Sequence, residues 1–80
     1  MSATERQFVV FGFASVHDTL EAEDVLKAAG VPASTIPSPR ELGDLCGIAL
    51  RVERADAEAA GTALAAAGSA PKGRTEISDF

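Results

Sequence analysis

The chain has 80 residues, a formal net charge of -5 and a pI of about 4.6, which suit one small acidic domain over residues 1–80, with an ordered core at about 7–78. Its seven basic residues are scattered, which excludes a basic stripe for nucleic acid, and its single cysteine excludes an internal disulfide. No apolar stretch approaches the ~20 residues of a transmembrane helix, so we expect a cytoplasmic protein that does not contact the membrane.

The first predicted element is a strand over residues 8–13, where the sequence FVVFGF is apolar at both odd and even positions. Such a run is typical of a central strand buried on both faces, and a partner subunit would be the simplest cover for its second face. A helix is expected next. Ser15 suits its N-cap, with Asp18 three residues on, and Gly30 suits its C-terminal stop because glycine readily adopts positive φ.

The middle of the chain predicts an edge strand, a loop and a second apolar strand. Residues 33–36 are half polar and are followed by Pro37 and Pro39, which favour the edge of a sheet. The loop has room for one helical turn over residues 40–45. Residues 46–53 then alternate between apolar and polar, as a half-buried strand does.

A second helix and a last strand complete the predicted elements. Asp56 suits the N-cap of a helix over residues 57–67, in which Leu64 is the only large apolar residue among alanines. Gly61 inside this helix costs about 1 kcal/mol relative to alanine, unless the helix must approach the sheet closely. A polar strand is expected over residues 72–78.

The order β-α-β-β-α-β predicts an α+β fold, a ferredoxin-like βαββαβ two-layer sandwich with an antiparallel sheet of strand order 4-1-3-2. This topology gives the central places to the two apolar strands and the edges to the two polar strands, so pattern and topology agree. In the last strand, Thr75 and Ile77 are expected to point inward.

The same topology should bring chemically active side chains to one end of the sheet, namely Ser15, His17, Arg40 and Cys46. A helix N-terminus and nearby cations can lower the pKa of a thiol from ~8.5 into the range of about 3.5–7.5, and histidine is the usual base partner of a thiol. The simpler interpretation is structural. Cys46 would then be a small buried residue, Gly47 a bulge or a close backbone passage, His17 a solvated side chain and Arg40 the partner of a carboxylate.

These residues resemble the Putative Se/S carrier protein-like family of small bacterial domains, over roughly residues 7–78. The resemblance rests on the strand at 8–13, Ser15 with His17, and the segments PSPREL and CGIALR, of which Pro39-Arg40 followed by Cys46-Gly47 is the most specific. It implies that Cys46 carries a persulfide or perselenide, with Arg40 and Gly47 around it. It also implies partner proteins that donate and accept the sulfur or selenium.

Two functions from different classes therefore stay open. The first is a thiol carrier that holds sulfur or selenium on Cys46 without a cofactor or a resident metal. The second is a non-catalytic regulatory module of ferredoxin-like fold that binds a small ligand or a protein and forms a homodimer through the sheet. A third hypothesis is a metal-transfer domain. It requires a dimer that brings two copies of Cys46 together, because soft metals prefer paired thiolates.

Overall fold

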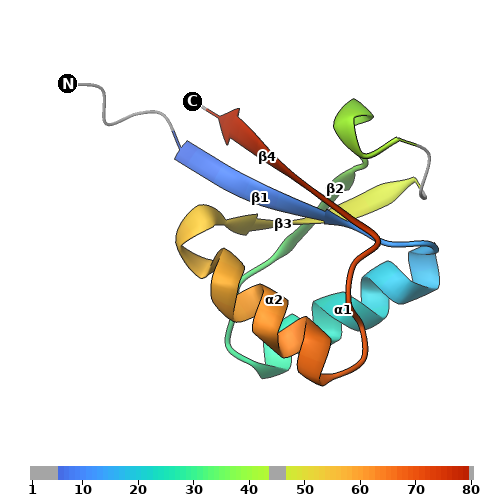
Figure 1. Ribbon diagram of the computed structural model, residues 1–80, viewed down its shortest axis with the longest axis vertical. Coiled ribbons are helices and arrows are strands. Elements are labelled where there is room, and N and C mark those ends of the chain that lie inside the picture. Colours follow the sequence, from blue (N-terminus) through green and yellow to red (C-terminus); the bar gives the residue numbers. More distant parts are fainter. Residues whose placement is uncertain (1–5, 44–46, 80) are drawn as a thin grey trace.

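A computed structural model describes residues 6–43 and 47–79. In chain order its elements are β1 (Arg6–Gly12), α1 (Val16–Ala28), β2 (Ser34–Pro37), the short 3-10 turn η1 (Arg40–Leu42), β3 (Ile48–Glu53), the 3-10 turn η2 (Arg54–Asp56), α2 (Ala57–Ala66) and β4 (Gly73–Asp79). The strands form one layer, and both helices lie together on one side of it (Figure 1). The fold is therefore α+β. None of the helices in the described ranges has the length and apolar composition that a bilayer crossing requires.

The four strands form a single antiparallel sheet in the order β2-β3-β1-β4. Counted from the β4 edge, the same neighbours read 4-1-3-2, which is how the expectation from the sequence was written. β1 is central because every one of its middle residues is apolar, and it pairs with β3 on one side and β4 on the other. The short β2, which ends at Pro37, lies at an edge, where a missing N–H disrupts no further ladder.

Local signals in the sequence fix both ends of α1. The Ser15 hydroxyl accepts a hydrogen bond from the Asp18 N–H at 3.0 Å, so the predicted N-cap is confirmed. At the other end Gly30 has φ +77°, and the N–H of Val31 donates to the Leu26 carbonyl at 2.9 Å. This is a glycine-terminated helix end in which otherwise unpaired carbonyls are satisfied.

The start of α2 differs from the prediction. Asp56 precedes the helix, but its side chain makes no capping hydrogen bond, and its backbone is already helical, with φ -98° and ψ -1°. A capping side chain needs the extended backbone of a true N-cap, and η2 runs directly into α2 without one. The helix ends as expected at Gly68, whose φ is +74°, and Leu64 is fully buried.

The main core lies between the sheet and the helices. It is built from side chains of one parity on β1 and β3 and from the inner faces of α1 and α2: Val9, Phe11, Phe13, Ala22, Leu26, Val31, Leu50, Val52, Ala57, Ala60 and Leu64. Several of these residues are alanines, so α2 can lie close to its neighbours but contributes little apolar volume. Leu64 is its one large buried side chain.

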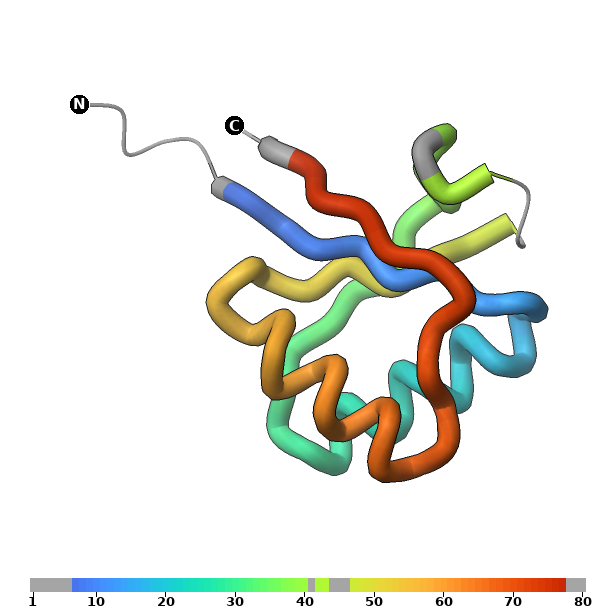
Figure 2. The backbone as a smooth tube through the Cα atoms, in the orientation of Figure 1, coloured from blue at the N-terminus to red at the C-terminus, as the bar shows by residue number. Residues whose placement is uncertain are grey.

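The face of the sheet opposite the helices is also largely shielded within the described chain. Phe8, Val10 and Ala49 have the outward parity, yet they are only 4%, 0% and 0% exposed. The loop after β2 starts at one edge, and its turn η1 contacts β4 at the other edge, so this loop crosses the open face (Figures 1 and 2). A partner subunit is therefore not needed to cover β1, contrary to the simplest expectation from the sequence.

The pairing register places the side chains of β4 differently from the prediction. Thr75 lies opposite Val10 on the open face, and Ile77 has the same parity, so neither points toward the helices. The side chains of Arg74 and Glu76 project on the side of β4 that faces the helices. The inward direction expected for Thr75 and Ile77 is thus not the direction of the helices: both side chains are half-buried on the face that η1 crosses.

Candidate functional site

The loop that carries Cys46 is held at both of its stems, although Cys46 itself lies outside the described residues. On one side Gly43 ends η1 with φ +71°, and its N–H donates to the Arg40 carbonyl at 3.0 Å. On the other side the N–H of Ser38 donates to the carbonyl of Gly47 at 3.2 Å, which extends the pairing of β2 with β3 by one step. The described residues on both sides of Cys46 are therefore held by backbone hydrogen bonds.

The expected neighbours of the thiol come from two sides of the sheet. Ser15 and His17 share the first turn of α1, whereas Arg40 is an exposed residue of η1, on the face opposite the helices (Figure 1). The structure thus brings Ser15 and His17 together and places Arg40 apart from them. The hydroxyl of Ser15 is engaged as the helix cap. Which of them approaches Cys46 stays a prediction.

Gly47 has no steric reason to be glycine among the described atoms. Its φ lies outside the left-handed region, and a Cβ built on it would meet no atom within 4 Å. The interpretation of Gly47 as a close backbone passage therefore finds no support. A side chain at this position would therefore meet none of the described atoms.

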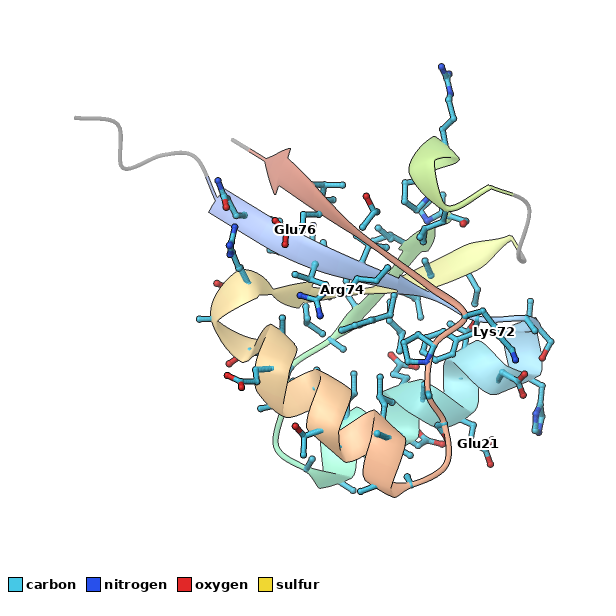
Figure 3. All side chains as sticks on the ribbon, viewed as in Figure 1. Glu21, Lys72, Arg74 and Glu76 are labelled. Carbon is cyan, nitrogen blue, oxygen red and sulfur yellow. The ribbon has the colours of Figure 1, made fainter. Side chains whose placement is uncertain are left out.

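A small hollow of about 200 Å³ lies between the start of α1 and the connection from α2 to β4. Asp18, Glu21 and Lys72 line it, and Figure 3 shows Glu21 on α1 and Lys72 on the connection that leads into β4. The N–H of Lys72 donates to the Gly12 carbonyl at 2.8 Å, which ties this connection to the end of β1. The hollow is polar and holds charges of both signs.

Three side chains beside this hollow have metal-ligand character. One ligand atom each from His17, Asp18 and Glu21 lies within 4.8 Å of the others, and His17 Nδ1 is 3.7 Å from Asp18 Oδ1. All three are exposed, and His17 is 85% exposed. The positive end of α1 and the neighbouring Lys72 both oppose a bound cation at this place.

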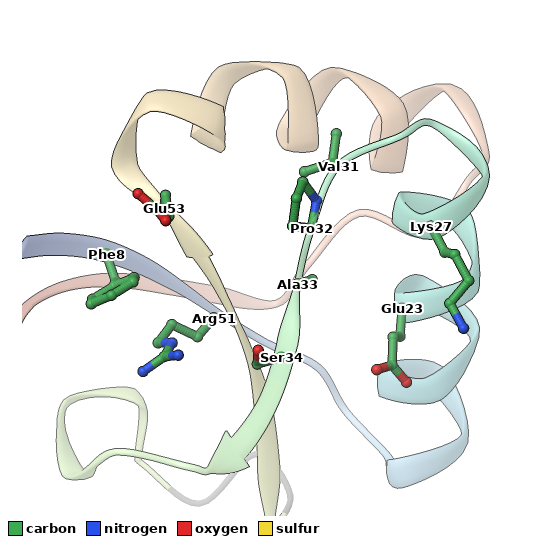
Figure 4. A pocket seen from close by; sticks show the side chains of 9 residues that line it. All are labelled: Phe8, Glu23, Lys27, Val31, Pro32, Ala33, Ser34, Arg51 and Glu53. Carbon is green, nitrogen blue, oxygen red and sulfur yellow. The ribbon is translucent and has the colours of Figure 1, made fainter.

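A larger hollow of about 270 Å³ lies along β2 and was not anticipated from the sequence. Glu23 and Lys27 of α1 reach it from one side of β2, and Phe8 and Arg51 from the other (Figure 4). The Arg51 guanidinium carbon lies 4.3 Å from the centroid of the Phe8 ring, within cation–π range. The sequence signal was present, because β3 carries two charged residues, Arg51 and Glu53, on its outward parity.

The described residues on either side of Cys46, Gly43 and Gly47, are thus hydrogen-bonded within the β2–β3 connection, and Arg40 is exposed on its turn η1. Comparison with known proteins gives one match: a family model described as Putative Se/S carrier protein-like covers residues 8–75. No curated protein and no solved structure matches the chain. The matched range includes Arg40, Cys46 and Gly47, both helices and most of the sheet. The chain belongs to the Putative Se/S carrier protein-like family.

Proposed function

We propose that the protein carries sulfur or selenium on Cys46 and passes it between partner proteins. The observation that supports this most is the family match, which spans residues 8–75 and so includes the single cysteine of the chain. We further propose that the fold is of the ferredoxin-like type and that the protein works in the cytoplasm, where thiols are kept reduced.

The transfer needs one thiol and no oxidant. The thiolate of Cys46 attacks the outer sulfur of a donor persulfide, a new S–S bond forms, and the donor's S–S bond breaks as its thiolate leaves. An acceptor nucleophile then takes the outer sulfur, and Cys46 leaves as a thiolate. Electrons balance in both steps, and selenium follows the same course. A resolving cysteine would be needed only for dithiol exchange.

The surroundings of the loop suit an anionic cargo. Arg40 is exposed and lies in the same β2–β3 connection as Cys46, and a guanidinium stabilises a nearby anion by charge-assisted hydrogen bonds. We assign to His17 and Ser15 a place at the rim of the site, on the first turn of α1.

The direct test is sulfur loading measured by intact-protein mass spectrometry. The protein is incubated with a cysteine desulfurase and cysteine, and the wild type should gain the mass of one sulfur atom, whereas Cys46→Ser should not. Arg40→Gln should load more slowly, and Arg54→Gln is its matched control, because Arg54 is an exposed arginine on η2.

Two results would contradict the proposal. One is a wild-type protein that gains no sulfur although the desulfurase is active on another acceptor. The other is an equal gain in Cys46→Ser, which would show that the added atom is not on this thiol. Equal loading rates in Arg40→Gln and Arg54→Gln would remove only the role assigned to Arg40.

The hollow along β2 favours a second candidate, a non-catalytic module that binds a small polar ligand. Its lining combines two cationic side chains, Lys27 and Arg51, with the carboxylates of Glu23 and Glu53 and the ring of Phe8. Such a lining suits a zwitterion. Titration with free amino acids, followed by amide NMR shifts, should move the signals of these residues equally in wild type and Cys46→Ser if this second function holds.

A further inference from the structure

The two edges of the sheet differ in how well they are protected from pairing with another strand. β2 has only four residues and ends at Pro37, and Pro32 and Pro39 lie close to its two ends. A short edge strand and nearby prolines are common features that prevent a sheet edge from pairing with another strand. β4, Gly73–Asp79, has seven residues and no proline, and within the described residues it pairs with β1 alone.

The charges of β4 are complementary to those of a second copy running antiparallel to it. Directly opposite residues in an antiparallel pair project on the same face of the sheet, whereas successive residues of one strand alternate between faces. A two-fold axis between two copies of β4 must therefore set one residue opposite the same residue of the second copy. An axis at Thr75 sets Arg74 opposite Glu76 of the second copy, and Glu76 opposite its Arg74. An axis at Arg74 or at Glu76 would instead place like charges opposite each other.

We infer that β4 pairs with β4 of a second copy of this chain, antiparallel and with Thr75 on the two-fold axis, which joins two four-stranded sheets into one. Both arginine–glutamate pairs then lie on the helical side, where Arg74 and Glu76 already project (Figure 3). On the open face, Ile77 packs across the axis beside Gly73. This inference goes beyond the carrier function and does not depend on Cys46.

The helices leave room for this arrangement. α2 packs against β3, which is two strands inward of β4. Two α2 helices would therefore be more than three inter-strand spacings of ~4.8 Å apart, which exceeds the 8–10 Å at which helices contact each other. The groove between them can hold the side chains of Arg74 and Glu76.

The existing ion pair of Glu76 is compatible with the dimer. Arg54 Nη1 lies 3.2 Å from Glu76 Oε1 and also donates to Gln7 Oε1 at 2.9 Å. A carboxylate has two oxygens and about four acceptor positions, so Glu76 can accept from both Arg54 and the second copy's guanidinium. Both members of the present pair are more than half exposed, so the carboxylate is accessible.

The test is a charge-reversal series on the full chain, with the oligomeric state measured by sedimentation equilibrium over a range of concentrations. The wild type should dimerise. Arg74→Glu and Glu76→Arg each turn two attractive cross-strand pairs into two repulsive ones, which should raise the dimer dissociation constant roughly tenfold or more. An equimolar mixture of these two variants should form a heterodimer, because every opposed pair is then again of opposite charge.

Controls separate this interface from misfolding and from net charge. Lys27→Glu and Asp24→Lys on α1 change the net charge by the same amounts and should dimerise like the wild type, and circular dichroism should show all variants folded. Cys46→Ser should also dimerise, so the outcome is independent of the carrier chemistry.

Three outcomes would overturn the inference. A wild type that stays monomeric at every concentration would show that β4 does not pair with a second copy, so that its edge binds a strand of another protein or is solvated. A wild-type dimer that both charge-reversal variants form equally well would place the interface elsewhere, for example on the open face. Failure of the mixed variants to associate would contradict the register with Thr75 on the axis.

Discussion

Gly61 lies in the middle of α2 without a structural need for glycine. Its φ is outside the left-handed region, and a Cβ added to it would meet no atom within 4 Å. The close approach to the sheet that could have explained a glycine here is therefore absent from the described structure. Glycine in a helix interior costs about 0.5–1 kcal/mol relative to alanine, so Gly61→Ala should stabilise the fold by that amount.

The gain is large enough to measure in a domain of this size. With 80 residues the unfolding entropy is ~170 cal/mol/K near 60 °C, so the expected gain raises Tm by about 3–6 °C. The total stability expected for such a chain is only about 4–12 kcal/mol. A single methyl group on α2 would thus supply a visible fraction of it.

Thermal unfolding followed by circular dichroism, together with urea unfolding, would measure the effect. The midpoint should rise and the urea m value should stay constant, because the surface exposed on unfolding hardly changes. Gly68→Ala is the matched control. Gly68 has φ +74°, so the same methyl group should lower stability by about 1–2 kcal/mol. A lower Tm for Gly61→Ala would refute the reasoning, since it would mean that something packs against that position.

Three further substitutions can be checked in the same unfolding assays. Ser15→Ala removes the hydroxyl that accepts the Asp18 N–H, and it should cost about 1 kcal/mol. Leu64→Ala removes the one large fully buried side chain of α2, and it should cost about 2–5 kcal/mol, enough to bring the domain close to unfolding at room temperature. Arg54→Gln breaks an exposed ion pair with Glu76, and its effect should stay below about 1 kcal/mol.

The regular elements followed from the sequence because their signals are local. The predicted N-cap of α1 at Ser15, its stop at Gly30 and the stop of α2 at Gly68 are all confirmed. The strand at 8–13 appears as β1, two residues earlier at its start. The one helical turn expected within 40–45 is η1. Periodicity and capping act within a few residues of the chain, so one sequence is enough to find them.

The features that the sequence did not predict depend on the path of the chain in space. Asp56 looked like an N-cap, but η2 brings it into the helix in an already helical conformation. Thr75 and Ile77 were expected to point inward, and they share the face of the sheet opposite the helices. Because η1 crosses the open face, the sheet has a second buried face. The direction in which a loop folds back cannot be predicted from a local sequence pattern.

The candidate site was predicted in part for the same reason. Ser15 and His17 lie together at the start of α1, and their approach to Cys46 stays a prediction. The predicted topology was expected to bring Arg40 to them, but Arg40 lies on η1, on the opposite side of the sheet. The hollow beside Arg51 was missed because it forms where the segment from α1 to β2 meets Phe8 of β1 and Arg51 of β3, which are distant from that segment in the chain.

The β2–β3 connection has two roles at once, and this affects how variants in it must be interpreted. Its turn η1 contacts β4 across the open face of the sheet, the face on which Val10 and Ala49 are buried, while the same connection carries Cys46. A change at half-buried Leu42 would therefore alter the stability of the fold and the geometry of the thiol loop together. Arg40 is exposed on the same turn, so its charge can be removed with little effect on packing. Only substitutions of exposed residues such as Arg40 can separate the chemistry of the thiol from the stability of the sheet that supports it.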